Sequence, residues 1–192
     1  AVALIVVPLP LVTVLFERGR FTADDSAATA VALQIYGLGL PAFVLQKVLQ
    51  PVYFARENTK TPFYFALVSM VVNAVIAIGL APIIGYAAAA FGTTLAGWAM
   101  VVLLWVGTSR IGEQTRFDAR FRSRLWRIGI ASCVMGAVLW VLALWLGPLL
   151  FTPGWRVVAL AVLVTLGAAS YFAIGHVIHA FRLSDFRSAM KR

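Results

Sequence analysis

Apolar residues fill most of the chain in long runs, and short polar segments separate them. No charged residue occurs between Lys60 and Arg110, a stretch long enough to cross a bilayer twice. The clearest break comes just before it, where Arg56 to Lys60 interrupt an apolar segment and Pro62 restarts it. This pattern predicts an all-α, polytopic transmembrane helix bundle in which residues 56–60 form a tight polar hairpin.

The apolar runs predict about six membrane crossings at about 20 residues each. The first run opens inside an apolar stretch without an initiator Met, so we expect it to be the remainder of a span cut from a larger protein. The expected segments are residues 1–16, 27–55, 63–82, 86–108, 128–145 and 157–181. Residues 17–21 and 147–155 are expected to be turns.

The composition supports a membrane protein, since 62% of the residues are hydrophobic and 12% are charged, against about 25% charged in soluble domains. The net charge of +9 would suggest a nucleic-acid partner for a soluble chain. Here all but three of the 16 Lys and Arg residues, namely Arg18, Arg20 and Arg156, fall on one side of the predicted spans. Because basic residues collect on the cytoplasmic side, we expect a cytoplasmic C-terminus and no nucleic-acid binding.

The longest polar segment, residues 110–127, predicts a cytoplasmic basic amphipathic linker. Phe117, Phe121 and Leu125 share one helical stripe, and four arginines share another. A helix of this kind lies at the membrane surface and contacts anionic lipids. The arginine stripe consists of Arg116, Arg120, Arg124 and Arg127.

Polar residues also occur inside the predicted span 27–55. Gln46, Gln50 and Tyr53 are spaced i, i+4 and i+7 on one helical face, with Lys47 beside them. Polar groups at this depth face a protein interior or a water-filled cavity, or else they lie near the interface and snorkel. All four are candidates for lining a substrate cavity.

Small residues form two stripes on the predicted span 86–108, and we expect them to pack against another helix. Recognisable catalytic motifs are absent from the sequence. His176 and His179 have a spacing that suits a metal, but no third ligand is near, and Cys133 is a single cysteine. We therefore expect no enzyme activity, no cofactor and no metal. The small stripes are Ala88, Gly92, Ala96 and Ala89, Thr93, Gly97.

Three motifs in the first third of the chain resemble the MurJ/MviN family of lipid II flippases. They read FERGRFTADD at 16–25, YGLGLP at 36–41 and KVLQPVYFARENTKTP at 47–62. The family belongs to the multidrug/oligosaccharidyl-lipid/polysaccharide exporter superfamily and has fourteen helices, in two lobes plus a final pair. The resemblance implies that this chain is the C-terminal part. Residues 1–109 would be later helices of the second lobe, 110–127 the linker, 128–181 the final helix pair and 182–192 a cytoplasmic basic tail.

By this resemblance, the function is to move undecaprenyl-linked peptidoglycan precursor (lipid II) from the inner to the outer leaflet of the bacterial cytoplasmic membrane by alternating access. The N-terminal lobe, which this chain lacks, would be a necessary partner. The final helix pair resembles the groove in which the family holds the lipid tail. A drug or polysaccharide exporter of the same superfamily, or a membrane enzyme subunit without transport activity, are the alternatives.

The resemblance also implies the remnant of an ion site. Some members of the family look to bind sodium between the two helices that correspond to residues 63–82 and 86–108, through an Asn, an Asp one turn later and a Thr. Asn73 and Thr93 stand at the matching positions, but Ala77 occupies the acidic one. A sodium ion in a low-dielectric site prefers a carboxylate ligand. We therefore expect Asn73 and Thr93 to hydrogen-bond across the helix pair, and transport not to depend on sodium.

Overall fold

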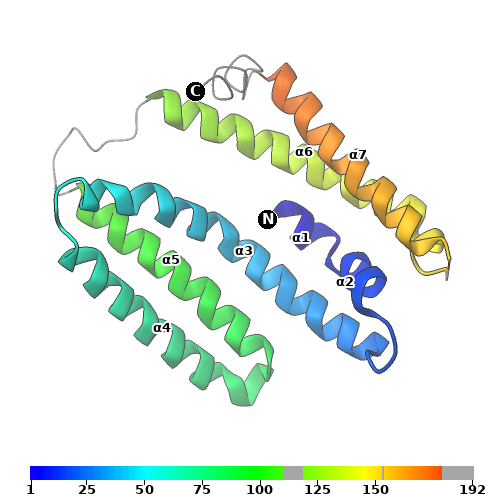
Figure 1. Cartoon of the computed structure of the whole chain (residues 1–192), viewed down its shortest axis with the longest axis horizontal. Helices are drawn as coiled ribbons and strands as arrows, with labels where there is room; N and C mark the ends of the chain where they lie inside the picture. The colour runs from blue at the N-terminus through cyan, green and yellow to red at the C-terminus, as the bar shows by residue number, and fades with distance from the viewer. Residues whose placement is uncertain (110–118, 153, 179–192) are drawn as a thin grey trace. The chain divides into compact units, whose positions relative to one another are not determined.

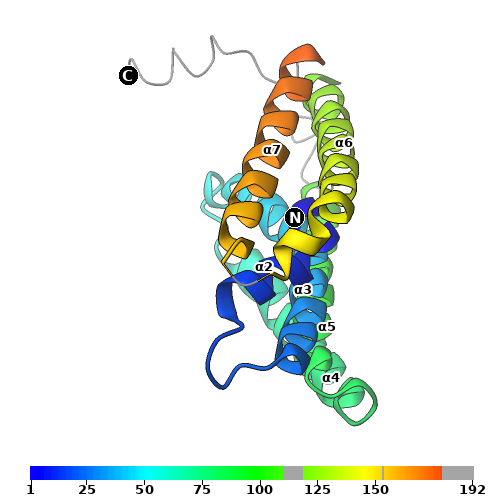
Figure 2. The same ribbon diagram turned by 90° about the vertical axis from the view of Figure 1, so that its right-hand side faces the viewer.

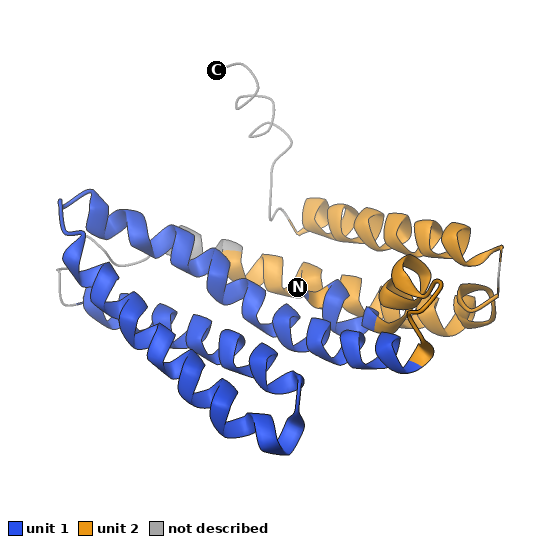
Figure 3. Cartoon of the chain, turned by 60° about the horizontal axis from the view of Figure 1, so that its bottom comes forward, with its two compact units in different colours: residues 1, 3–8, 24–116 blue, residues 2, 9–23, 117–192 orange. Residues whose placement is uncertain are grey.

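Every regular element of the described chain is an α-helix. The computed structural model describes residues 1–109, 119–152 and 154–178. Its helices are α1 (Val2–Val6), α2 (Pro8–Phe16), α3 (Ala23–Phe54), α4 (Lys60–Ile84), α5 (Ala87–Ser109), α6 (Ala119–Leu150) and α7 (Arg156–Val177), drawn in Figure 1. The chain forms two compact units, shown in Figure 3. The first unit consists of the described residues within 1, 3–8 and 24–116, and the second of those within 2, 9–23 and 117–192.

Five of the described helices are long and apolar enough to cross a membrane. They are α3, α4, α5, the part of α6 from Leu125 to Leu150, and α7. The sixth expected segment, residues 1–16, is divided into the short helices α1 and α2. The division comes at Val7, whose backbone leaves the helical region immediately before Pro8, because a proline disfavours helical geometry in the residue before it.

The first unit depends on close packing of helix backbones. α4 and α5 lie side by side, and a Cβ atom on Gly92 would come within 2.9 Å of the Asn73 carbonyl oxygen. Ala88 and Ala96, which share the stripe of Gly92, are buried as well. The stripe predicted from the sequence therefore packs against α4, as small residues do between membrane helices.

The second unit contains the antiparallel pair α6 and α7, which lie together in Figures 1 and 2. Gly167 of α7 faces Leu139 of α6 so closely that a Cβ atom would lie 2.6 Å from a Leu139 methyl group. Leu139 and Leu163 are both almost fully buried. The glycine thus lets the two helices approach each other over a leucine contact.

The start of α6 differs from the expected arrangement. Residues 119–127 are not a separate surface helix but the first turns of α6, which continues without a break into the apolar span. A single glycine, Gly129, costs only about 1 kcal/mol in a helix and does not end it. At the other end, Gly147 and Pro148 belong to the last turn of α6, so the connection to α7 begins at Phe151 rather than at Gly147.

The polar hairpin between α3 and α4 is confirmed and has a defined geometry. Asn58 N–H donates to the Tyr53 carbonyl at 3.1 Å and Glu57 N–H to the Phe54 carbonyl at 3.0 Å, the bond pair of a Schellman motif. Glu57 takes the left-handed conformation, with φ 57°, that this motif normally gives to glycine. Asn58 Oδ1 then accepts from Thr61 N–H at 3.1 Å and caps the start of α4.

Replacing Glu57 with glycine should stabilise the protein, because glycine adopts the left-handed conformation without the cost of roughly 1 kcal/mol paid by other residues. The expected gain is somewhat below 1 kcal/mol, since glycine also loses more entropy on folding. Thermal unfolding of the detergent-solubilised protein measures it. Glu57→Ala is the matched control, because it removes the side chain but keeps the strained backbone; an equal gain in that variant would show that strain is not the cause.

Candidate functional site

The polar face of α3 that the sequence singled out lies against α5. Gln46 Nε2 donates to the Gly97 carbonyl at 2.9 Å, and the Tyr53 hydroxyl donates to the Leu104 carbonyl at 2.9 Å. Gln46 is half-buried and Tyr53 is buried. Of the two interpretations of this face, the structure favours a protein interior over a snorkelling position for these two residues.

α5 returns two hydrogen bonds to α3. Thr94 Oγ1 donates to the Ile35 carbonyl at 2.9 Å, and Trp98 Nε1 donates to the Leu38 carbonyl at 3.1 Å. The sequence analysis did not identify either donor, although their i, i+4 spacing in a span without charges was a usable signal. Bonds of this type contribute about 0.6–2 kcal/mol each within a membrane.

These four bonds together fix the position of α5 along α3. Their attachment points on α3 extend from Ile35 to Tyr53, which corresponds to about 27 Å of helix at 1.5 Å per residue. The two helices run side by side in both views of the chain (Figures 1 and 2). The α3–α5 pair is therefore connected over nearly the full thickness of the hydrocarbon core.

Tyr53 joins three helices rather than two. Its ring packs edge-on against Phe65 of α4, with 6.3 Å between ring centroids and an interplanar angle of 89°. On α5, Gly107 leaves the space that the Tyr53 hydroxyl occupies, because a Cβ atom there would collide with the hydroxyl and would lie only 3.2 Å from the Phe65 ring. Tyr53 is 1% exposed. It is a packing and hydrogen-bonding centre of this end of the first unit.

Lys47 differs from its neighbours because its side chain is exposed. It lies on a stripe of exposed apolar residues that includes Val44 and Pro51, and it forms no ion pair within the described chain. Pro51 also lacks the N–H that would normally bond the Lys47 carbonyl. A lysine facing lipid at the centre of a span costs about 2.5–3.5 kcal/mol, so this stripe favours contact with water or an anionic group.

Gln50 lies between these two groups of residues. It is half-buried, and no hydrogen bond of its side chain occurs within the described residues. Because it follows Lys47 by three positions, its amide is a helical neighbour of the ammonium group. Gln50 and Lys47 are thus the two predicted cavity residues whose side chains remain available.

The residues of the expected ion site do not form the predicted bond. Thr93 Oγ1 donates to Ala89 O in its own helix at 2.9 Å, while Asn73 is half-buried and lies close to Gly92 of α5. The bond between α4 and α5 comes instead from Ser69, whose hydroxyl donates to Ala96 O at 2.8 Å. No group of three His, Cys, Asp or Glu residues able to hold a metal occurs in the described part of the chain.

The predicted arginine stripe is only partly described. Arg120, Arg124 and Arg127 belong to α6, whereas Arg116 lies outside the described residues. Contact of this stripe with anionic lipids stays a prediction.

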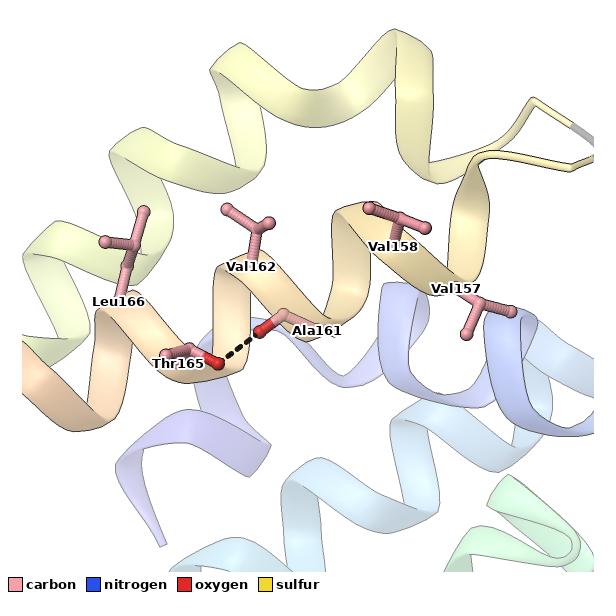
Figure 4. Close-up of a pocket in the computed structure, with 6 residues that line it drawn as sticks. All are labelled: Val157, Val158, Ala161, Val162, Thr165 and Leu166. Carbon is pink, nitrogen blue, oxygen red and sulfur yellow. Dashed lines mark hydrogen bonds between the residues drawn. The ribbon is translucent and has the colours of Figure 1, made fainter.

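An open apolar groove runs along one face of α7 in the second unit. It has a volume of about 450 Å³, and Figure 4 shows the side chains that line it. The only polar group among them, the Thr165 hydroxyl, already donates to the Ala161 carbonyl at 2.7 Å. The groove therefore suits an apolar chain. Its lining consists of Val157, Val158, Ala161, Val162, Thr165 and Leu166.

Five long apolar helices, three of which (α3, α4 and α5) are joined by side-chain bonds to backbone carbonyls, define a polytopic α-helical membrane protein. Residues 1–166 match the sequence profile of the family described as "Lipid II flippase MurJ". The chain belongs to this family, as the loop and hairpin motifs indicated.

Similar proteins support the assignment. The chain is 38% identical over 195 residues to "Probable lipid II flippase MurJ" of Rhizobium meliloti (strain 1021), covering 100% of the chain and 36% of the relative. For the Vibrio cholerae protein of the same description, the identity is 36% over 192 residues, covering 97% and 35%. A solved structure, "Lipid II flippase MurJ, inward closed conformation", has the same fold, with a TM-score of 0.74, 24% identity, and coverage of 93% of this chain and 35% of that one. The chain thus spans about a third of its relatives' length.

Removing the Tyr53 hydroxyl should weaken the junction of the three helices in a measurable way. Tyr53→Phe loses the bond to Leu104 but keeps the ring against Phe65, so we expect a loss of about 1 kcal/mol in the free energy of unfolding. Tyr53→Ala also leaves a cavity and should cost about 3–5 kcal/mol. Unfolding in detergent measures both. Tyr86→Phe, at an exposed tyrosine, is the control, and a Tyr53→Phe variant no less stable than this control would contradict the assigned bond.

Proposed function

We propose that the full-length protein containing this chain moves lipid II from the inner to the outer leaflet of the bacterial cytoplasmic membrane by alternating access. The single observation that supports this most strongly is the family match over residues 1–166. This chain would supply later helices of the second lobe (residues 1–109), the basic linker and the final helix pair. The distribution of basic residues supports a cytoplasmic position for the hairpin at residues 56–60 and for the C-terminus.

Moving a charged headgroup across the membrane requires a cation such as Lys47 within a span. A pyrophosphate-sugar headgroup cannot cross about 30 Å of hydrocarbon unaided, so the protein has to offer it a polar, cationic path. Lys47 is exposed and without an ion pair in the described chain, and Gln50 is its neighbour. In this proposal Lys47 and Gln50 contact the headgroup, while Gln46 and Tyr53 hold α3 against α5 so that the position of Lys47 is defined.

The lipid tail needs no polar contacts and can stay in the bilayer. The groove on α7 has a volume of about 450 Å³ and an apolar lining, whose single hydroxyl, that of Thr165, is already bonded. We assign the tail to this surface of the final helix pair. The available family match supports lipid II over the other exporter substrates, and no observation in the described chain favours an enzyme.

Removal of the Lys47 charge should impair flipping. Lys47→Gln loses a charge-assisted contact to the diphosphate, worth about 1.5–3 kcal/mol, so flipping in proteoliposomes should fall about tenfold or more. Lys47→Arg should keep most of the activity, because the charge remains. Arg20→Gln, in the opposite loop, is the matched control. If Lys47 only snorkelled to the interface, Lys47→Gln would insert at least as well and flip normally, and that result would contradict the assignment.

Flipping should not require a sodium gradient, because Ala77 supplies no carboxylate and Thr93 bonds within its own helix. Proteoliposomes with and without a sodium gradient should show equal rates, both for the unmodified protein and for Asn73→Ala. A strict sodium requirement that Asn73→Ala abolishes would show that an ion site exists without its carboxylate.

A further inference from the structure

The start of α4 carries a second cavity, which the transport proposal does not use. It has a volume of about 440 Å³ and lies beside the polar hairpin within the first unit. Its lining combines one cation, two hydroxyls and two aromatic rings, from Lys60, Thr59, Phe63 and Tyr64, whose ring carries the second hydroxyl. The two rings pack edge-on with 5.9 Å between their centroids.

Recognition at this cavity would come from side chains rather than from the helix terminus. Thr61 N–H is already bonded to Asn58 Oδ1 at 3.1 Å, and Pro62 has no N–H. Few backbone donors are therefore free at the start of α4. Lys60 is exposed and carries the only charge in the lining, so the cavity favours an anion with an apolar part that can contact Phe63 and Tyr64.

The cavity also lies at a particular depth relative to the membrane. Pro62 is the only buried residue of the described helix α4. The outer face of α4 is a continuous row of exposed apolar side chains. From Phe63 to Ile78 this face extends about 22 Å, most of the roughly 30 Å of hydrocarbon. Lys60 and Tyr64 are then at the level of the lipid headgroups, where Lys and Tyr are enriched. The exposed row comprises Phe63, Leu67, Met70, Val71, Val75 and Ile78.

We propose that this cavity binds the headgroup of a single acidic phospholipid whose acyl chains lie along the outer face of α4. Lys60 pairs with the phosphate, and the Thr59 hydroxyl donates to it. The rings of Phe63 and Tyr64 enclose the glycerol and the first methylenes. The leaflet is the cytoplasmic one if the proposed orientation is correct, but binding itself does not depend on that orientation or on flipping.

Native mass spectrometry of the full-length protein, purified with phosphatidylglycerol, tests this proposal by counting retained lipids. Lys60→Gln should weaken the affinity for the tightest-bound phosphatidylglycerol about fivefold, the factor expected for one basic residue at an anionic surface, and so lower its occupancy. The double variant Phe63→Ala/Tyr64→Ala should also lower it, although the charge is unchanged. Lys60→Arg should retain the lipid, and Arg20→Gln, at an exposed arginine of another loop, is the matched control.

Three results would overturn the proposal. Normal retention in Lys60→Gln would show that the cation does not hold a lipid. Loss in Lys60→Gln but not in the aromatic double variant would show general charge attraction without a defined cavity. Equal loss in Arg20→Gln would show that any surface arginine or lysine has the same effect. Thermal unfolding of each variant confirms that a lost lipid does not reflect a lost fold.

Discussion

The hydrogen bonding between α3 and α5 is the interaction on which the first unit depends. In hydrocarbon no water is present to satisfy a side-chain amide or hydroxyl, so each donor in a span needs an acceptor within the protein. Backbone carbonyls supply it here: Gln46 and Tyr53 use those of α5, and Thr94 uses that of Ile35 in α3. Because the bonds run in both directions, neither helix can slide or rotate against the other without exposing a donor.

This arrangement separates two roles that are adjacent in the sequence. Gln46 and Lys47 are consecutive, yet the amide points to α5 while the ammonium group lies on the exposed stripe. Successive side chains of an α-helix point about 100° apart around its axis. Gln46 can therefore lie on the face that bonds α5 while Lys47 lies on a face that can contact an anion. The bonded face therefore determines where the exposed face is directed, and a change at Gln46 or Tyr53 would also displace Lys47.

Much of the fold could be predicted from the sequence because its signals are local. Runs without charge identified the long helices, Arg56 to Lys60 identified the hairpin, and the spacing of Ala88, Gly92 and Ala96 identified a packing face. The partners of individual side chains could not be predicted in the same way. Both the lipid-facing and the protein-facing sides of a membrane helix are apolar, so periodicity does not show which carbonyls a donor will meet.

Thr93 and α6 illustrate the limits of that local information. A threonine hydroxyl can bond the carbonyl four residues earlier in its own helix, and Thr93 does so with Ala89, although the family resemblance suggested a bond across the helix pair with Asn73. The change from basic to apolar residues near Arg127 marks a change of environment, but α6 continues through it. Composition indicates the solvent around a helix better than it indicates where the helix ends.

The long sequence separation of the α3–α5 bonds has a consequence for biosynthesis. The acceptors of Gln46 and Tyr53 lie 51 residues later in the chain, so α3 is synthesised before α5 exists. At about 5–20 residues per second, its donors wait about 3–10 s for their partners. Only two residues separate α4 from α5, so these helices can pair as a hairpin first and then dock onto α3. Until then, α3 has to remain where water or the insertion machinery can satisfy Gln46 and Tyr53.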